Sequence, residues 1–298
     1  MTNVNQQSSV GTTQKTKGVS AFIDWISVTH KTKGDCPLPD SLPKESIRTN
    51  GQNGYTHAKK YLTGVIEMVN PNRPDMGTHI MYSGKTLQLI QERYGVTRDE
   101  ILHFHTNISG RIARIDYAID LRGYNLNIDG LWEQLESGQA TTKSSHSRIQ
   151  SGNDKGYTLY VGSRKKRKKL LRVYDKAKEL GNFVDDYKRI ELECHSDSAR
   201  NSASLYINSG FSPQTITSMV RAFCDFPLSN VWSTVLNTEP LKIPTGDKSI
   251  GNTEKWLLEQ VAPAFARVLV TNPEFYEIFK NQVEYEYNDF IANQLPAQ

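Results

Sequence analysis

A tyrosine flanked by basic residues at alternate positions is the most reactive arrangement in this chain. Tyr174 lies between Arg172 and Lys176, and two carboxylates, Glu191 and Glu193, follow at strand spacing. A phenolate can attack a phosphodiester, arginines can orient the phosphate, and carboxylates can hold a divalent cation that polarises it. The neighbouring cations are expected to lower the tyrosine pKa below its usual value of about 10. We therefore predict that Tyr174, Arg172 and Lys176 are catalytic and act on DNA with Mg²⁺ or Mn²⁺.

An unbroken basic run lies a few residues before the tyrosine. It comprises Arg164, Lys165, Lys166, Arg167, Lys168 and Lys169. Such a run is typical of a surface that binds a phosphate backbone, and Arg114 and Arg189 are expected to add DNA contacts. We expect the run to loop between a strand at GYTLYVGSR and the strand that carries Tyr174. A solvated hairpin tip would have the same composition, so both interpretations remain open.

Alternation of apolar and charged residues predicts the strands that carry these groups. The segments RIARIDYAIDL, LLRVYDK and YKRIELEC each have an apolar side and a charged side. If they share one sheet, the charged sides form one surface. That surface would carry Arg114, Asp116, Asp120, Arg172, Tyr174, Lys176, Arg189, Glu191 and Glu193. An antiparallel sheet with one wet face would also show mixed charges in cross-strand ion pairs, and this structural interpretation stays beside the catalytic one.

A helix-initiation signal decides how two histidines are placed. His103-Phe104-His105 has the His-hydrophobic-His pattern of many nicking enzymes, in which both imidazoles bind a metal. Thr97 and Glu100 form a capping box just before it, which predicts a helix. On a helix the two imidazoles point about 200° apart, so we predict two partly exposed histidines rather than a metal site.

The remaining pattern predicts an α+β protein. VSAFIDWISVTH, with Asp24 at its centre, is a further strand, and HIMYSGKTLQLIQERYG is a strand followed by a helix. We expect a curved antiparallel sheet with helices packed on its apolar face. Ser212-Pro213 begins a helical C-terminal part, in which Pro263 is expected to kink one helix. The predicted organisation is a disordered polar tail over 1–18, a catalytic domain over 19–210 and a helical domain over 211–298.

Composition favours a reducing compartment. The chain has 298 residues, of which 36 are basic and 32 acidic, for a net charge of +4. Its three cysteines, Cys36, Cys194 and Cys224, form no CxxC pair and no even framework. The first residues are polar, unlike a signal peptide, and no apolar stretch approaches the ~18 residues of a membrane span. We therefore expect a cytoplasmic protein.

Four segments together resemble the replication initiation factor family. They are AFIDWISV, RIDYAID, YVGSRKKRKKLLRVYDKAKE and RIELE, in this order between about residues 20 and 195. The Arg-x-Tyr-x-Lys motif around Tyr174 is the most specific of them. Two features depart from the family pattern: the stretch after Gly-Ser-Arg is unusually basic, and His195 stands where relatives often carry Arg or Lys.

The resemblance implies a fold, a reaction and partners. Members are rolling-circle initiators of small plasmids and filamentous phages, related to relaxases, with a fold close to that of the His-pair nickases but without the His pair. It implies that Tyr174 is the nicking nucleophile and that Asp116 and Glu191 are metal ligands, with Asp24 as a third candidate. The implied reaction nicks one strand at a hairpin of the replicon's own origin, leaving a 5′-phosphotyrosyl bond and a 3′ hydroxyl primer. Implied partners are a bacterial host's helicase and polymerase, and a second copy of the chain.

Two other functions fit the same residues. A relaxase that starts conjugative transfer would use the same chemistry, and the neighbouring genes would distinguish it. A non-catalytic DNA-binding regulator on the same fold would keep its function when Tyr174 is changed to Phe.

Overall fold

The chain forms two compact units. The computed structural model describes residues 17–31, 37–150, 156–163, 168–244 and 257–294. Contacts divide the chain into a larger unit, Met1–Thr245, and a smaller one, Gly246–Gln298. The division therefore falls after residue 245, whereas the sequence placed it after residue 210. Most of the predicted N-terminal tail lies outside the described residues.

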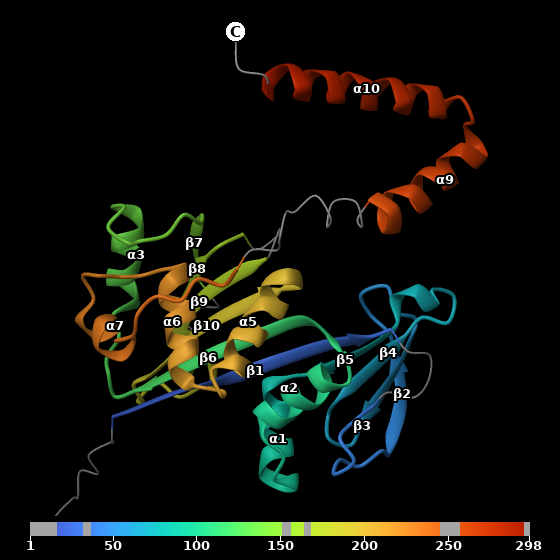
Figure 1. The fold of residues 1–298 in the computed structure, drawn as a ribbon. Coiled ribbons are helices and arrows are strands. Elements are labelled where there is room, and N and C mark those ends of the chain that lie inside the picture. Colours follow the sequence, from blue (N-terminus) through green and yellow to red (C-terminus); the bar gives the residue numbers. More distant parts are fainter. Residues whose placement is uncertain (1–16, 32–36, 151–155, 164–167, 245–256, 295–298) are drawn as a thin grey trace, which may run out of the picture. The chain divides into compact units, whose positions relative to one another are not determined.

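A ten-stranded antiparallel sheet forms the centre of the larger unit (Figure 1). The strands lie in the order β2-β3-β4-β5-β1-β6-β10-β9-β8-β7. Their bounds are β1 Gly18–His30, β2 Ser46–Asn50, β3 His57–Tyr61, β4 Ile66–Val69, β5 Thr78–Tyr82, β6 Arg111–Arg122, β7 His146–Gln150, β8 Tyr157–Val161, β9 Lys169–Asp175 and β10 Tyr187–His195. The predicted fold class is confirmed, and the three charged strands of the sequence pattern, β6, β10 and β9, are neighbours in the sheet.

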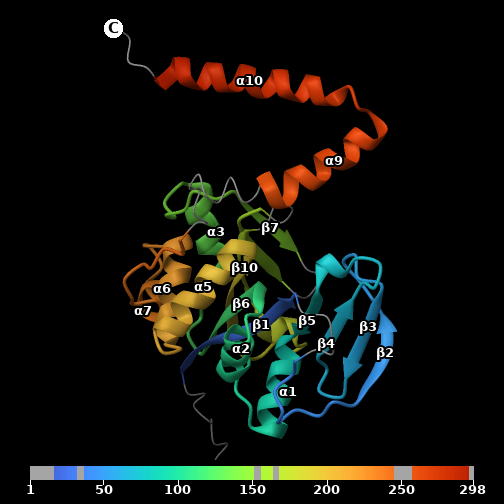
Figure 2. The same cartoon turned by 45° about the vertical axis from the view of Figure 1, so that its right-hand side comes forward.

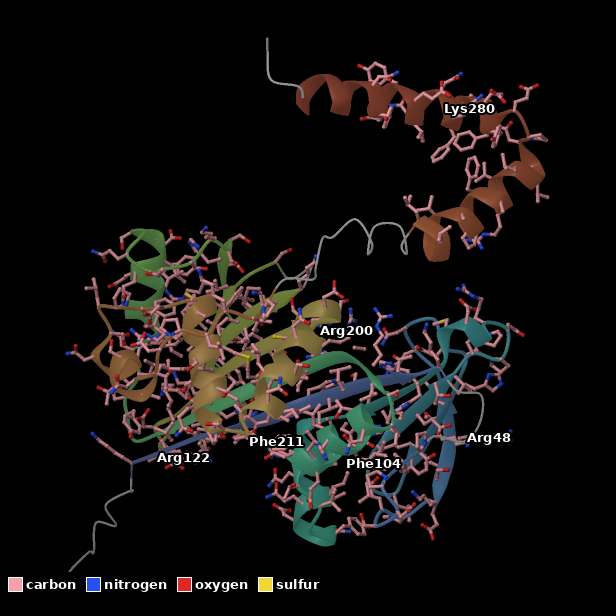
Figure 3. All side chains as sticks on the ribbon, in the orientation of Figure 1. Arg48, Phe104, Arg122, Arg200, Phe211 and Lys280 are labelled. Atoms are coloured by element: carbon pink, nitrogen blue, oxygen red, sulfur yellow. The ribbon has the colours of Figure 1, made fainter. Side chains whose placement is uncertain are left out.

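Helices cover the apolar face of the central strands. The helices of the larger unit are η1 Pro74–Met76, α1 Gly84–Tyr94, α2 Arg98–Asn107, α3 Ile128–Glu136, α4 Lys176–Glu179, α5 Ser196–Asn208, α6 Pro213–Phe223 and α7 Asn230–Val235. Of these, α1 and α4 contribute residues to a pocket on the charged side. Helices α5 and α6 lie side by side over β1, β6 and β10 in both views (Figures 1 and 2). Side chains fill the space between these helices and the sheet (Figure 3).

Helix α6 belongs to the sheet unit because of its apolar face. Ile216, Met219 and Val220 recur at helical spacing and are almost completely buried in the same core as the sheet residues. The burial of three such side chains stabilises the fold by several kcal/mol, at about 1.5–3 kcal/mol each. A helical pattern in the sequence does not reveal which sheet or helix it packs on, and this is why the predicted boundary lay 35 residues too early.

The capping box predicted at the start of α2 is present. The Thr97 hydroxyl accepts from the Glu100 amide at 3.2 Å, and the Glu100 carboxylate accepts from the Thr97 amide at 2.7 Å. On this helix His103 is exposed, as expected, but the expectation for His105 is wrong. His105 is fully buried, with Nε2 2.7 Å from the Tyr82 hydroxyl, and burial lowers its pKa to about 3.

A β-bulge in β1 changes which residues face the charged side of the sheet. Ile23 pairs with Tyr117 of β6, but Trp25 pairs with Asp116, so Asp24 is an extra residue in β1. Bulges of this kind redirect side chains and occur frequently next to active sites. As a result, Asp24 and Trp25, although adjacent in the chain, both line pockets on the charged side.

The smaller unit is helical. It contains a π-helical turn, η2 Leu257–Val261, followed by α9 Ala262–Thr271 and α10 Phe275–Gln294, which carries Lys280 (Figure 3). The change from π to α geometry lies next to Pro263, where the sequence predicted a kink, because proline has no N–H to donate. Phe265 of α9 contacts Phe279 of α10, with 4.6 Å between ring centroids. Within the described parts of the chain, no helix combines the length and apolar character needed to cross a bilayer.

Candidate active site

Tyr174 faces a carboxylate from the neighbouring strand. Its hydroxyl donates to Oε1 of Glu191, and the two oxygens are 2.6 Å apart. Arg172, two residues earlier on the same face of β9, stands directly opposite Glu191 and forms an ion pair with its other oxygen. The Glu191 side chain is only 4% exposed. A tyrosine, an arginine and a buried carboxylate therefore form one contiguous group, on the strands that the sequence predicted.

The environment of Tyr174 raises the pKa of its phenol well above the usual value. Burial is the largest cause, and the negative charge of Glu191 is the next. The sequence predicted the opposite shift, because it placed cations on both sides of the tyrosine. That prediction is wrong because Arg172 and Arg189 are paired with carboxylates, while the phenol itself contacts a carboxylate. Tyr174 is consequently protonated at neutral pH.

Lys176 reaches the site from a helix and not from the strand. β9 ends at Asp175, whose carboxylate accepts from the Lys178 amide at 2.9 Å and so caps α4. The Lys176 ammonium pairs with Glu179 and lies 5.7 Å from the centre of the Tyr174 ring. The predicted proximity of Lys176 to the tyrosine is therefore found, although the strand alternation that suggested it stops one residue earlier.

Arg189 connects three carboxylates beside the tyrosine. Its Nε and Nη2 donate to the two oxygens of Asp120 at 2.6 and 2.9 Å, which is a bidentate pair. Its Nη1 lies 3.1 Å from Oδ2 of Asp24 and 3.8 Å from Oε1 of Glu191. The Tyr187 hydroxyl also donates to Asp120, at 2.6 Å. Burial raises the pKa of Asp24 above its ordinary value, even though the charge of Arg189 opposes that change.

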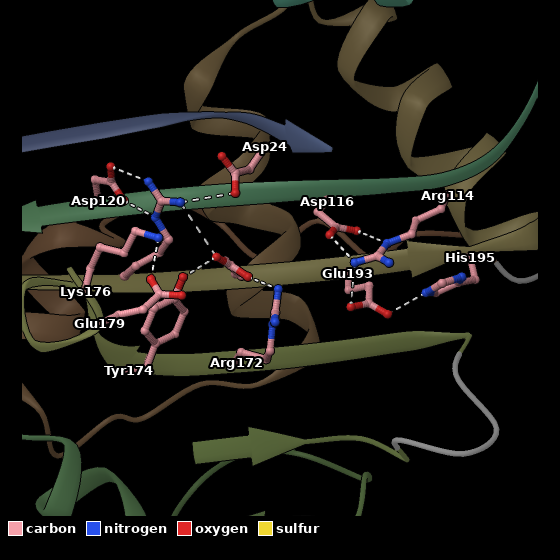
Figure 4. A network of polar contacts seen from close by, with 12 residues as sticks. Asp24, Arg114, Asp116, Asp120, Arg172, Tyr174, Lys176, Glu179, Glu193 and His195 are labelled. Carbon is pink, nitrogen blue, oxygen red and sulfur yellow. Dashed lines mark hydrogen bonds and ion pairs between the residues drawn. The ribbon is translucent and has the colours of Figure 1, made fainter. Parts of the chain in front are cut away.

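A second charged cluster lies further along the same strands. Arg114 donates to both oxygens of Asp116 at 2.9 and 2.6 Å and to Glu193 at 3.0 Å. His195 Nε2 is 2.6 Å from the other oxygen of Glu193. Burial raises the pKa of Asp116 to about 6. Figure 4 shows this cluster separate from the one that contains Asp24, Asp120, Arg172 and Tyr174.

The predicted metal ligands are thus divided between two clusters. Asp24 and Glu191 lie beside Tyr174, whereas Asp116 and Glu193 are held by Arg114. Among the described residues, no group of three or more His, Cys, Asp or Glu side chains is placed to hold a metal ion. The four carboxylates do not form the single site that the sequence suggested, because strand spacing fixes the side of the sheet but not the partner of each carboxylate.

Asp24 and Glu191 nevertheless fit a magnesium ion. Mg²⁺ is usually bound through one or two carboxylates, with waters and substrate phosphates as the other ligands. These two carboxylates both approach the same nitrogen, Nη1 of Arg189, so they flank one position that a cationic group occupies. Gly84 allows the chain to approach Asp24 closely, since a Cβ there would lie 2.5 Å from Oδ1 of Asp24. The donor chemistry suits a hard divalent cation, which would take the position that Nη1 of Arg189 occupies.

A pocket of about 960 Å³ opens next to this group. Besides Asp24, Asp120, Lys176 and Arg189, it is lined by cationic residues that the sequence analysis did not identify: Lys85, Arg98 and Arg122. Arg98 comes from the start of α2, and its guanidinium lies 4.2 Å from the centre of the Phe22 ring. Strand alternation could not find Lys85 or Arg98, because they belong to helices that reach the site from the side.

The predicted basic run is only partly described by the structure. Arg164, Lys165, Lys166 and Arg167 lie outside the described residues. Lys168 is exposed, and Lys169 begins β9. The Lys169 ammonium lies 5.4 Å from the ring centre of Phe223 in α6, on the helix-covered side of the sheet. Lys169 therefore points away from Tyr174, which is on the opposite face of β9.

Two comparisons with known proteins give matches. The family model described as "Replication initiation factor" matches residues 110–280, a span that includes Asp116, Tyr174 and Glu191 and begins after Asp24. A solved structure, "Structure of Rolling Circle Replication Initiator Protein from Geobacillus stearothermophilus", is similar in fold, with a TM-score of 0.62 and 20% identity. The likeness covers 76% of this chain and 99% of that one. No curated protein matches the chain.

Proposed function

Because this chain belongs to the replication initiation factor family, we propose that it initiates rolling-circle replication by nicking one DNA strand at the origin of its own replicon. The contact between the Tyr174 hydroxyl and the Glu191 carboxylate at 2.6 Å carries this proposal. It pairs a nucleophile with a proton acceptor, within reach of cationic side chains that suit a phosphate. The fold likeness to a rolling-circle initiator supports it.

In the proposed reaction, Oη of Tyr174 attacks the phosphorus of the scissile phosphodiester. The Oη–P bond forms, the bond from phosphorus to the 3′ oxygen breaks, and that oxygen leaves and takes a proton from water to become the 3′ hydroxyl that primes synthesis. The raised pKa of Tyr174 means that little phenolate exists beforehand, so the proton must leave as the attack proceeds. Glu191 lies at hydrogen-bond distance and is the group that accepts it.

The other residues of the group would bind and orient the phosphate. Arg172 and Arg189 offer planar guanidinium groups that match phosphate oxygens, and Lys176 adds a point charge. Asp24 and Glu191 would hold Mg²⁺ or Mn²⁺, which when bound neutralises charge on the phosphate oxygens. In the second cluster we assign Asp116 and Glu193 to the positioning of Arg114 rather than to metal binding, since both are engaged by that guanidinium.

We infer the partners of this protein from the products of the proposed reaction. A 3′ hydroxyl at the nick is a substrate for a host polymerase, and displacement of the cut strand requires a host helicase. The remaining 5′-phosphotyrosyl bond conserves the energy of the broken linkage, so a second transesterification would release a circular single strand. A second copy of the chain would supply a second tyrosine for that step. All of this takes place in the cytoplasm of a bacterial host.

The test uses supercoiled DNA of the element that encodes this gene, incubated with the protein and Mg²⁺ or Mn²⁺. We expect open circles and an SDS-stable protein–DNA adduct. Tyr174→Phe keeps the ring and removes only the hydroxyl, so it should bind the same DNA without producing either. Binding without an adduct from the unmodified protein would instead favour a DNA-binding regulator. Nicking only at a transfer origin would favour a relaxase.

A further inference from the structure

A second pocket lies on the charged side of the sheet, away from Tyr174. It has a volume of about 790 Å³, within the range of pockets that bind small ligands. In the sheet, Arg189 of β10 pairs with Tyr174 of β9. Four residues further along β10, Glu193 pairs with Asp116 of β6, which in turn pairs with Trp25 of β1. At about 3.3 Å per residue, this pocket begins roughly 13 Å along the strands from the tyrosine.

Three aromatic rings that line this pocket are held in place by contacts with neighbouring side chains. The Tyr55 and His79 rings are stacked, with centroids 5.5 Å apart and 22° between their planes, and His79 Nδ1 is 2.9 Å from the Thr29 hydroxyl. The Trp25 indole N–H donates to the Ser27 hydroxyl at 2.7 Å. Each ring is partly exposed and lines the pocket. The rings are held in place before a ligand arrives, so little side-chain entropy would be lost on binding.

The polar groups around the rings suit a nucleotide. The guanidinium of Arg114 lies 4.8 Å from the centre of the Trp25 ring, and the amides of Gln52 and Asn53 line the rim. Side-chain amides can pair with the edges of bases, and aromatic rings stack on base faces. None of the described residues that line this pocket is an aspartate or glutamate, whereas the pocket beside Tyr174 includes Asp24 and Asp120. An anionic strand meets no carboxylate among those lining residues, and the carboxylates of Asp116 and Glu193 behind them are both paired with Arg114.

We propose that this pocket binds an unpaired base of the strand that Tyr174 cuts, a proposal that rests on the function proposed above. The base stacks on Trp25 or Tyr55, and Arg114 contacts its phosphate. A base inside a duplex is stacked and paired and cannot enter, so the pocket selects DNA that is already unwound. Anchoring a base at this end of the sheet fixes the register of the strand and hence which phosphate reaches Tyr174.

The test compares two single-stranded probes of equal length in the Tyr174→Phe background, in which the strand is not cut. One probe is an oligothymidylate, and the other has the same backbone with abasic residues. Trp25→Leu should weaken oligothymidylate binding about 5- to 150-fold, which corresponds to the ~1–3 kcal/mol of a base–aromatic stack. Binding of the abasic probe should not change. Trp25→Phe, which also loses the bond to Ser27 but keeps a ring, should retain most of the affinity.

The outcomes separate this inference from the function on which it rests. Equal loss for both probes, or no loss for either, overturns the base pocket while leaving the nicking proposal intact. If the parent protein binds neither probe nor origin DNA, both proposals fail. Because Trp25 lies in a central strand, Tyr55→Leu provides a second variant outside the strands, with Tyr55→Phe as its control. It should show the same loss for oligothymidylate alone, with unchanged thermal unfolding.

Discussion

Replacing Glu191 with glutamine tests the chemistry most directly. The amide has nearly the same shape and can still accept from the Tyr174 hydroxyl, but it cannot take the proton. A positioned general base contributes about 10²- to 10⁴-fold to a rate, so Glu191→Gln should slow nicking by that factor. This corresponds to about 2.7–5.4 kcal/mol of activation free energy. Loss of the negative charge should also bring the pKa of Tyr174 back toward its usual range, because that charge is one cause of the upward shift.

The assay is the initial rate of adduct formation on supercoiled DNA, measured across pH at Mg²⁺ concentrations shown to saturate each variant, because Glu191 is also a proposed metal ligand. Without a base, the reaction depends on phenolate formed by hydroxide, so the rate of the variant should rise about tenfold for each pH unit. Binding of the same DNA, measured without metal, shows whether the change affects chemistry or affinity.

Glu193→Gln is the matched control. Glu193 lies two residues further along β10 on the same face, its side chain is 2% exposed compared with 4% for Glu191, and each carboxylate is paired with one arginine of a neighbouring strand. Glu191→Gln removes the carboxylate paired with Arg172, which costs up to about 3–5 kcal/mol, whereas in Glu193→Gln the guanidinium of Arg114 keeps its pair with Asp116. Glu193→Gln should therefore lose no more stability than Glu191→Gln, and only Glu191→Gln should nick slowly. If Glu191→Gln nicks within tenfold of the parent at every pH, or if Glu193→Gln is equally slow, Glu191 is not the base.

Three further predictions concern the buried histidine, the proposed metal ligands and the basic run. His105 has a pKa of about 3 in the fold and about 6.5 when unfolded, so only the unfolded chain binds a proton between these values, and stability should fall as the pH falls below 6.5. The loss at pH 5 should be about 2 kcal/mol by urea unfolding and should shrink in His105→Gln; an identical slope in the variant would contradict this account. Asp24→Asn should raise the Mg²⁺ concentration needed for half-maximal nicking, whereas Asp116→Asn should not, and the reverse result would place the ion in the other cluster. Neutralising Arg164–Arg167 should reduce the slope of log binding constant against log salt by about 3 for single-stranded DNA, and an unchanged slope would show that the run does not contact phosphates.

Strand periodicity predicted much of the site, because period-two alternation alone places Tyr174, Arg172, Glu191 and Arg189 on one side of their strands. That those strands share one sheet was only a condition of the sequence argument, and the structure shows that they are neighbours. The register between neighbouring strands could not be predicted from the sequence pattern. Whether Glu191 faces Arg172 or Arg114 depends on how far one strand is shifted against the next, and the two arginines are equally suitable partners by charge.

Other differences arise where tertiary contacts overrule a local pattern. Asp24 reaches the site through a bulge, which inserts one residue without a sequence signal that alternation would detect. His105 is buried because Tyr82 and His30 provide partners from other strands. The pKa shift of Tyr174 had the opposite sign to the prediction because the nearby cations are already neutralised, and only the three-dimensional pairing reveals this.

The contact between Arg189 and Asp24 joins residues 165 positions apart in the chain. β1 is the first strand in the chain, yet β6, one of the two strands that it pairs with, begins about 80 residues after β1 ends. Glu191 and Arg189, which lie beside Tyr174, come only with β10. Pairings of such long range form late in folding because a large loop must close first. A nascent or truncated chain that ends before β10 therefore has the tyrosine but neither Glu191 nor Arg189. The cleavage that we propose would therefore require a complete central sheet, and a partly made chain would lack the groups needed to cut the DNA around it.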